Sequence, residues 1–336
     1  MKTLAWTGAG ILMCVVFFAS ERVIDVPRAY RMFRYPAETA MRIFGFAHFA
    51  VALYFLLSSR RMRSPRAVLG LASLVPVALA LAAGFTWLGG IDNPLMLLAV
   101  YFYFFVHDFR DLAFFYKCSG DCRDPRPAER AGLFSALQVM LMTLLLPFVV
   151  PTYFEYLAMH GELPRDDPVL AVIFPASVPF LTKFAAYLAP VLVLNAGIFW
   201  HVAQRYPGGW RAIGREHGPL LAVFGGYGAL VLSGLVLGHW SLHYAVLAHF
   251  VGWYLFALGK LRTAPPARRT YNPLRWMRRS PVGFAVLHLG VAAAAGGLMA
   301  VSAYGFAGKG VLASLTGETS FYCWTILHIT LSFIPR

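Results

Sequence analysis

Apolar stretches long enough to cross a bilayer recur along nearly the whole chain, and they limit its fold more than any other feature. A helix needs about 20 apolar residues to span the hydrocarbon core of a membrane. Ten segments of this kind lie at roughly 3–20, 42–58, 67–89, 94–117, 131–154, 178–203, 218–237, 240–260, 282–303 and 319–334. Only 13% of the 336 residues are charged, about half the share in soluble domains. The sequence therefore predicts an all-α, polytopic transmembrane helical bundle of about ten spans, with no soluble domain.

The links between these segments are short and show no internal repeat. We therefore expect residues 1–336 to form a single integral-membrane domain. The first segment resembles a signal peptide, but only one Lys precedes its apolar core and the match to a cleavage site is loose. A retained signal-anchor helix at residues 1–20 is the expectation, and a cleaved signal peptide is the alternative.

The formal net charge of +14 resides mainly in the links. Basic links at 58–66, 117–130, 204–217 and 260–279 alternate with acidic or neutral ones, and only 21–41 breaks the alternation. Because cytoplasmic links carry an excess of Lys and Arg, even-numbered spans are predicted to run from outside to cytoplasm. We expect a multi-pass protein of a bacterial-type inner membrane with the lipid bilayer as its partner. The basic residues form no base-reading surface, so nucleic-acid binding is excluded.

Ten histidines are present, and most fall inside predicted spans. Ionisable side chains at membrane depth are rare and are functional candidates by default. By contrast, His160 and His217 fall in links, where we expect solvated side chains. His201 and Asp108 are placed nearer the cytoplasmic face.

A metal site is the hypothesis that best accounts for several histidines at similar depth, since imidazoles from several helices can converge in a bundle core. The predicted ligands are His48, His107, His249 and His328, with His243 as a substitute. Asp111 lies four residues after His107 and shares its helix face.

Carboxylates beside these histidines complete the predicted site. We expect Asp111 to be a ligand or the partner that orients an imidazole. Asp108 is the second carboxylate considered for a catalytic role. Ferrous iron is the expected ion, because iron with imidazole ligands and open positions activates dioxygen.

The sequence leaves three alternatives open. Each histidine could make an ordinary interhelical hydrogen bond. His107 with His249 or His328 could hold b-type haem in a non-enzymatic subunit for electron transfer. The histidines and aspartates could instead line the proton relay of a transporter.

The order of the histidines resembles the Brp/Blh family of integral-membrane β-carotene dioxygenases. The stretch "GFAHFAVAL" places His48 like the family's "PHGALD" element, and "FVHDFRD" places His107 and Asp111 like its "IHFGxAD" element. "LHYAVLAHFVGWYLF" resembles its histidine cluster, and "ILHITLSF" places His328 like its "PHMxLxD" element.

The chain differs from the Brp/Blh pattern at several positions. The prolines before the first and last histidines, the aspartates after them and the adjacent His-His pair are missing. The resemblance implies non-haem iron and the oxidation or cleavage of a polyene. The sequence is thus interpreted as a metal-dependent membrane oxygenase, an oxidoreductase acting on a hydrophobic small molecule such as a lipid, isoprenoid or carotenoid.

Overall fold

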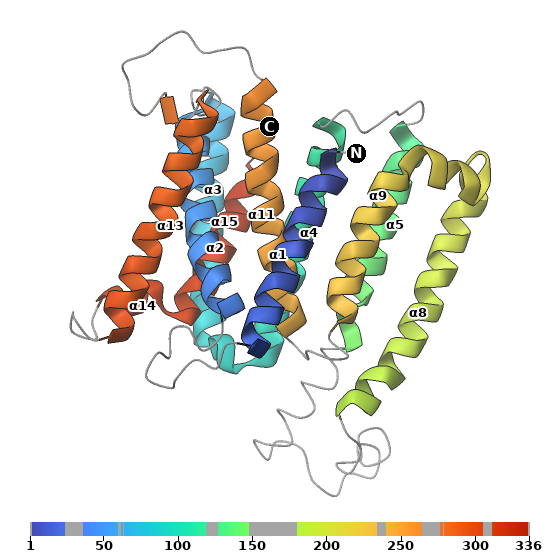
Figure 1. Ribbon diagram of the computed structural model, residues 1–336, viewed down its shortest axis with the longest axis horizontal. Coiled ribbons are helices and arrows are strands. Elements are labelled where there is room, and N and C mark those ends of the chain that lie inside the picture. The colour runs from blue at the N-terminus through green and yellow to red at the C-terminus, as the bar shows by residue number, and fades with distance from the viewer. Residues whose placement is uncertain are drawn as a thin grey trace, which may run out of the picture. The chain divides into compact units, whose positions relative to one another are not determined.

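The computed structural model is all-helical over the residues that it describes (Figure 1). These residues are 2–23, 36–59, 62, 64–118, 127–147, 180–233, 240–263, 276–277, 279–304 and 311–334. The helices are α1 (Lys2–Val23), α2 (Pro36–Leu57), α3 (Pro65–Trp87), α4 (Pro94–Cys118), α5 (Pro127–Thr143), α8 (Phe180–Arg205), α9 (Gly209–Leu232), α11 (Trp240–Thr263), α13 (Pro281–Tyr304), α14 (Val311–Thr316) and α15 (Glu318–Ser332). A 3-10 turn, η3 (Gly90–Asp92), precedes α4.

Each of the ten apolar segments predicted from the sequence overlaps one of these helices, and the short α14 is an additional one. The helix α9 begins at Gly209, inside the predicted 204–217 link. Five stretches are long and apolar enough to cross a membrane: Glu38–Leu57, Pro65–Trp87, Ala185–Arg205, Leu242–Arg262 and Pro281–Ser302. The all-helical fold is confirmed for the described residues, and its apolar helices indicate a membrane protein. Membrane crossing by the remaining helices stays a prediction.

The chain divides into two compact units. Unit 1 consists of Met1–Gly8 and Asp92–Ala245, and unit 2 of Ala9–Ile91 and Val246–Arg336. The helices α1 and α11 therefore contribute residues to both units.

In unit 2, α15 packs against α2 and α3, and α13 packs against α2 (Figure 1). Fully buried side chains such as Met41, Phe284 and Phe321 fill this core. Arg42 adds a polar tie, because its guanidinium pairs with Glu38 at 3.3 Å and donates to the backbone oxygen of Thr316 in α14.

In unit 1, α5 packs against α4, α8 and α9. Two hydrogen bonds of one side chain fix α8 against the end of α5. Asn195 of α8 donates through Nδ2 to the backbone oxygen of Met140 at 2.9 Å, and its Oδ1 accepts from the Thr143 hydroxyl at 2.7 Å. Asn195 is buried, where an amide without such partners would be costly.

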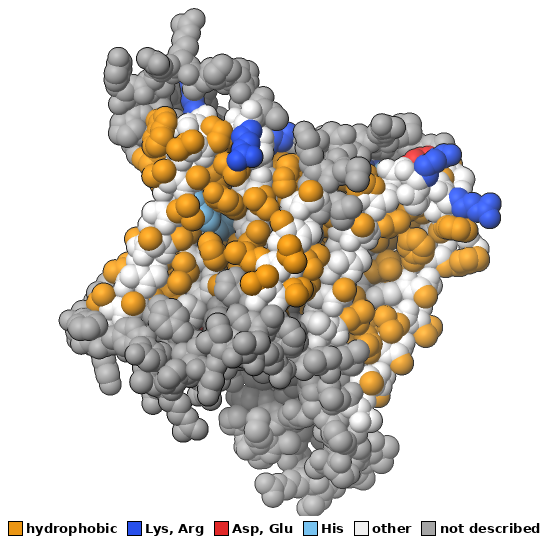
Figure 2. Space-filling view, in the orientation of Figure 1, with side chains coloured by type: hydrophobic (Ala, Val, Ile, Leu, Met, Phe, Trp, Pro, Cys, Tyr) orange, Lys and Arg blue, Asp and Glu red, His pale blue; other side chains and the backbone are white. Residues whose placement is uncertain are grey.

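Large apolar side chains are exposed on the outer faces of several helices, as Figure 2 shows for one side of the molecule. Leu69 of α3 and Val193 of α8 are 71% and 74% exposed. Soluble monomers rarely leave extended apolar areas in water. Lipid contact explains these faces.

Candidate functional site

Three of the predicted ligand histidines come together in the core of unit 2. His48 comes from α2, His249 from α11 and His328 from α15. The Nε2 atoms of His48 and His328 are 3.0 Å apart, and the ring centroids of His48 and His249 are 5.4 Å apart. His48 and His249 also each offer a ring nitrogen within 4.8 Å of the other. We call these three residues the unit 2 histidine cluster.

Aromatic side chains surround the histidine cluster. Trp253 lies perpendicular to the His48 ring at 4.4 Å, and Phe250 lies 5.1 Å from it. Phe49 stacks on His328 at 4.9 Å with the rings 29° apart. His48 is fully buried, and His249 is 2% exposed. The rings therefore hold the imidazole planes in place and keep bulk water away.

A glycine allows the helices to approach closely enough to form the cluster. Gly45 lies three residues before His48 in α2, and a Cβ atom there would be 2.5 Å from Phe321 of α15 and 3.0 Å from Phe250 of α11. Ordinary van der Waals contact needs 3.4 Å or more. The absent side chain thus lets both aromatic rings pack onto the α2 backbone one turn from His48.

The predicted ligands His107 and Asp111 belong to unit 1. Nε2 of His107 is 3.7 Å from Oδ2 of Asp111, with the imidazole buried and the carboxylate half-buried. The two side chains share a face of α4, in agreement with their four-residue spacing. Asp108 on the same helix is fully buried. Their proposed roles at a metal or in catalysis stay predictions.

The remaining predicted histidines are in different surroundings. His243 is buried in unit 1, with its ring 6.2 Å from Tyr101, whereas His249 of the same helix belongs to unit 2. His201 is exposed, which makes it a poor candidate for a buried site. His160 lies outside the described residues.

His288 was not among the predicted ligands, but it is buried in unit 2 with 3% exposure. Its ring lies 4.7 Å from Tyr254 and 6.1 Å from Phe284. Its Nε2 finds no hydrogen-bond partner among the described residues. Among the described residues, His288 belongs to no group of His, Cys, Asp or Glu side chains that could hold an ion.

His217 corrects the expectation of a solvated histidine, because it is fully buried. It marks a kink in α9, where its φ and ψ of −124° and 19° depart from helical values. Pro219 follows two residues later, and a proline removes a helical hydrogen bond and obstructs the preceding turn. The kink lets the side chain turn inward although its sequence context is a charged link.

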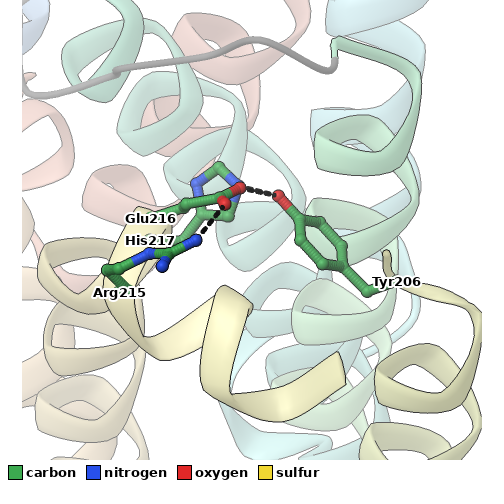
Figure 3. A network of polar contacts seen from close by, with 4 residues as sticks. All are labelled: Tyr206, Arg215, Glu216 and His217. Carbon is green, nitrogen blue, oxygen red and sulfur yellow. Dashed lines mark hydrogen bonds and ion pairs between the residues drawn. The ribbon is translucent and has the colours of Figure 1, made fainter. Parts of the chain in front are cut away.

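Two tyrosines, Tyr116 and Tyr206, hold the His217 ring in place. Figure 3 shows His217 with Tyr206 and with Glu216, to which Tyr206 is hydrogen-bonded. Tyr206 lies 3.0 Å from Nε2, and Tyr116 of α4 lies 3.1 Å from Nδ1. Tyr206 also donates to Oε2 of Glu216 at 2.7 Å. Because the Tyr206 hydroxyl donates to Glu216, Nε2–H of His217 donates to the Tyr206 oxygen. The Tyr116 hydroxyl lies within hydrogen-bond distance of Nδ1 and also donates to the backbone oxygen of Glu216 at 3.4 Å. We call this set the His217 network.

Sequence reasoning missed the His217 network because its members lie in three separate segments of the chain. The usable signal was Pro219, which predicts a break that turns nearby side chains out of helical register. Both ring nitrogens are hydrogen-bonded to side chains, so the network fits a structural role. It links α4 to the α8–α9 connection and to α9.

Comparisons with protein-family models, curated proteins and solved structures found no match to this chain. The resemblance to the Brp/Blh family therefore stays a prediction that rests on the quoted residues.

Proposed function

We propose that this chain is a ten-span membrane metalloprotein whose ion is held by His48, His249 and His328. We further propose that the ion is ferrous iron and that the protein oxygenates a hydrophobic lipid, isoprenoid or carotenoid. The observation that carries the proposal is the 3.0 Å separation of the His48 and His328 Nε2 atoms within a cluster built from three helices.

The distance between the Nε2 atoms of His48 and His328 can be compared with the distances expected for two ligands of one ion. With metal–nitrogen bonds of about 2.1 Å, ligands at a right angle have their nitrogens about 3.0 Å apart, whereas tetrahedral ligands have them about 3.4 Å apart. The His48–His328 distance of 3.0 Å is that of a hydrogen bond between the two rings, which bound metal would replace, and it equals the spacing of neighbouring ligands of an octahedral ion. Ferrous iron with protein ligands on one side and open positions on the other fits this pattern.

The surrounding residues suit an apolar reaction. Phe49 stacks on His328 and fixes the plane of that imidazole, while Trp253 and Phe250 pack on His48. Bound iron would supply the position at which dioxygen is activated. The chain's own residues would orient the ligands, exclude water and offer aromatic surface to a hydrophobic substrate.

Two residues of unit 1 are also part of the proposal. His107 is proposed as a further ligand, and Asp111 as the carboxylate that binds the ion or orients an imidazole. The substitution His107→Ala tests this part by itself: reduced metal content would support it, and unchanged content would exclude His107 from the ligand set.

Haem binding is the second candidate function. The distance between His48 and His328 argues against haem held by these two residues. Two axial histidines lie on opposite sides of the iron, so bonds of about 2 Å place their nitrogens about 4 Å apart. His48 and His328 are too close at 3.0 Å for that arrangement. Haem held by His107 with His249 or His328, and a His/Asp proton relay, stay alternatives.

Metal analysis and an optical spectrum of the purified protein test the proposal together. We expect close to one iron per chain, no Soret band, and at least tenfold less iron in His48→Ala and His328→Ala. His288→Ala is the matched control, since it removes another buried imidazole of unit 2. A Soret band would select haem. Absence of any transition metal, or equal iron in all variants, would overturn the proposal.

A further inference from the structure

The connection between α8 and α9 in unit 1 exposes basic and aromatic side chains together. The stretch Ala185–Arg205 is long and apolar enough to cross a membrane, and α9 begins shortly after it at Gly209. Figure 2 shows basic side chains gathered where the two helices meet in Figure 1. Three arginines and two tryptophans are exposed here: Arg205, Arg211, Arg215, Trp200 and Trp210. We call these five residues the α8–α9 patch.

The exposed side chains of α8 change from apolar to charged along the helix. Val193 is 74% exposed, Trp200 is 64% exposed about two turns later, and Arg205 ends the helix. Val193 and Arg205 are about 18 Å apart along the helix axis, and half of a hydrocarbon core is about 15 Å deep. Tryptophan is enriched at the boundary between membrane and water. This order suits a helix with Val193 in the hydrocarbon core, Trp200 at its edge and Arg205 among the lipid headgroups.

The first turns of α9 direct their basic side chains outward. At 100° per residue, Trp210, Arg211 and Arg215 fall within an arc of about 140° around the helix, and all three are exposed. Ala212 and Ile213 fall on the rest of the circumference and are buried. This segment therefore packs its apolar side against the protein and presents a basic side with one tryptophan.

Hydrogen bonds join the first turns of α9 to the end of α8. The Tyr206 hydroxyl contacts Glu216 at 2.7 Å and His217 at 3.0 Å (Figure 3). The N–H of Gly209 donates to the backbone oxygen of Tyr206 at 2.8 Å. Gly208 and Gly209 have φ values of 86° and 63°, which glycine adopts without strain. These contacts fix the turn that carries the α8–α9 patch.

Two of the three guanidinium groups can reach a phosphate. Arg215 pairs with Glu216 at 3.3 Å, so much of its charge is already balanced. Arg211 lies over the Trp210 ring at 5.4 Å, and its side chain is exposed. Arg205 is exposed and has no ion pair among the described residues. A guanidinium can donate two parallel hydrogen bonds to a phosphate, so Arg205 and Arg211 are the groups suited to bind one.

We propose that the α8–α9 patch binds an anionic membrane lipid, with the headgroup phosphate at Arg205 and Arg211 and the two tryptophans at the boundary between headgroup and acyl chains. Charge complementarity and the position of Trp200 between apolar and charged surface carry this assignment. An acidic protein would explain the arginines but not a tryptophan at the edge of the apolar surface. The patch shares no residue with the unit 2 histidine cluster, and its occupancy does not depend on bound metal.

Lipid binding by the purified full chain tests the patch. Detergent-solubilised protein is titrated with phosphatidylglycerol or phosphatidylcholine, and bound lipid is counted by native mass spectrometry. We expect phosphatidylglycerol to bind about tenfold more tightly, and Arg211→Gln to reduce that preference about fivefold. Arg66→Gln is the matched control: Arg66 is also exposed in the first turn of an apolar helix, and the charge change is identical. No Trp lies in the first turns of that helix.

Two competitors separate the lipid from other anions. Neither inorganic phosphate nor soluble poly-glutamate should displace bound phosphatidylglycerol, because neither has acyl chains to place beside the tryptophans. Thermal unfolding confirms that both variants are folded. Equal binding of the two lipids, or equal losses in Arg211→Gln and Arg66→Gln, would overturn the proposal. Displacement by phosphate would indicate a site for the free anion, displacement by poly-glutamate would indicate an acidic protein partner, and either result would also overturn it.

Discussion

Two buried histidine sites show how different surroundings give the same residue different chemistry. In the unit 2 histidine cluster, His48 contacts two other imidazoles and is otherwise packed by aromatic rings. In the His217 network of unit 1, one imidazole is bonded to two tyrosine hydroxyls, one of which also donates to a carboxylate. Converging imidazoles suit a shared ion, whereas the second arrangement suits a fixed structural contact.

The largest expected effect on stability comes from removing the imidazole of the His217 network. His217→Ala should lower the free energy of unfolding by about 3 kcal/mol, because the buried hydroxyls of Tyr116 and Tyr206 lose partners and a cavity forms. Thermal unfolding in detergent measures the change. Iron content per folded chain should equal that of the wild type. Loss of iron without loss of stability would instead indicate that His217 takes part in binding the metal and is not a structural contact.

Removing one hydroxyl from the same network should cost less. Tyr206→Phe deletes the contacts to Nε2 of His217 and to Glu216, and we expect a loss of about 2 kcal/mol. Tyr254→Phe, at a half-buried tyrosine outside the His217 network, is the control for a general effect of losing a tyrosine hydroxyl. An equal or greater loss in the control would mean that the His217 network contributes nothing specific.

A change at Gly45 tests the packing that brings the histidine cluster together. Gly45→Ala should displace Phe321 and Phe250 and separate α2 from its neighbours, since added volume in a filled core is destabilising. We expect iron to dissociate about tenfold more readily in a chelator titration. Gly84→Ala is the control, because nothing lies within 4 Å of a Cβ at that position. Identical chelator titrations for the two variants would show that the histidine cluster does not depend on the close approach of α2 to its neighbours at Gly45.

The smallest expected effect concerns His288, a buried histidine outside both sites. Phenylalanine fits its aromatic surroundings and removes the cost of burying a polar ring atom, so His288→Phe should raise the free energy of unfolding by about 1 kcal/mol. Thermal unfolding provides the value, and iron content should not change. A marked loss of stability would show that the His288 imidazole makes a contact that stabilises unit 2.

The positions of the helices could be predicted from the sequence because apolar runs dominate it. The approach of His48 to His328 could not, since 280 residues separate them and the spacing of histidines within one helix says nothing about packing between helices. The similar depth predicted for the histidines in the membrane was compatible with their meeting at one site but did not require it. For His217, a link rich in charged residues suggested solvent, while the local break before Pro219 turned the ring into the core.

X-ray absorption spectroscopy at the metal edge can show whether His48, His249 and His328 bind one metal ion. We expect at least three imidazole nitrogens at about 2.0–2.2 Å, with one fewer imidazole in any residual metal of His328→Ala. His217→Ala should leave the spectrum unchanged. A spectrum without imidazole scattering, or one identical in wild type and His328→Ala, would show that these histidines are not the ligands.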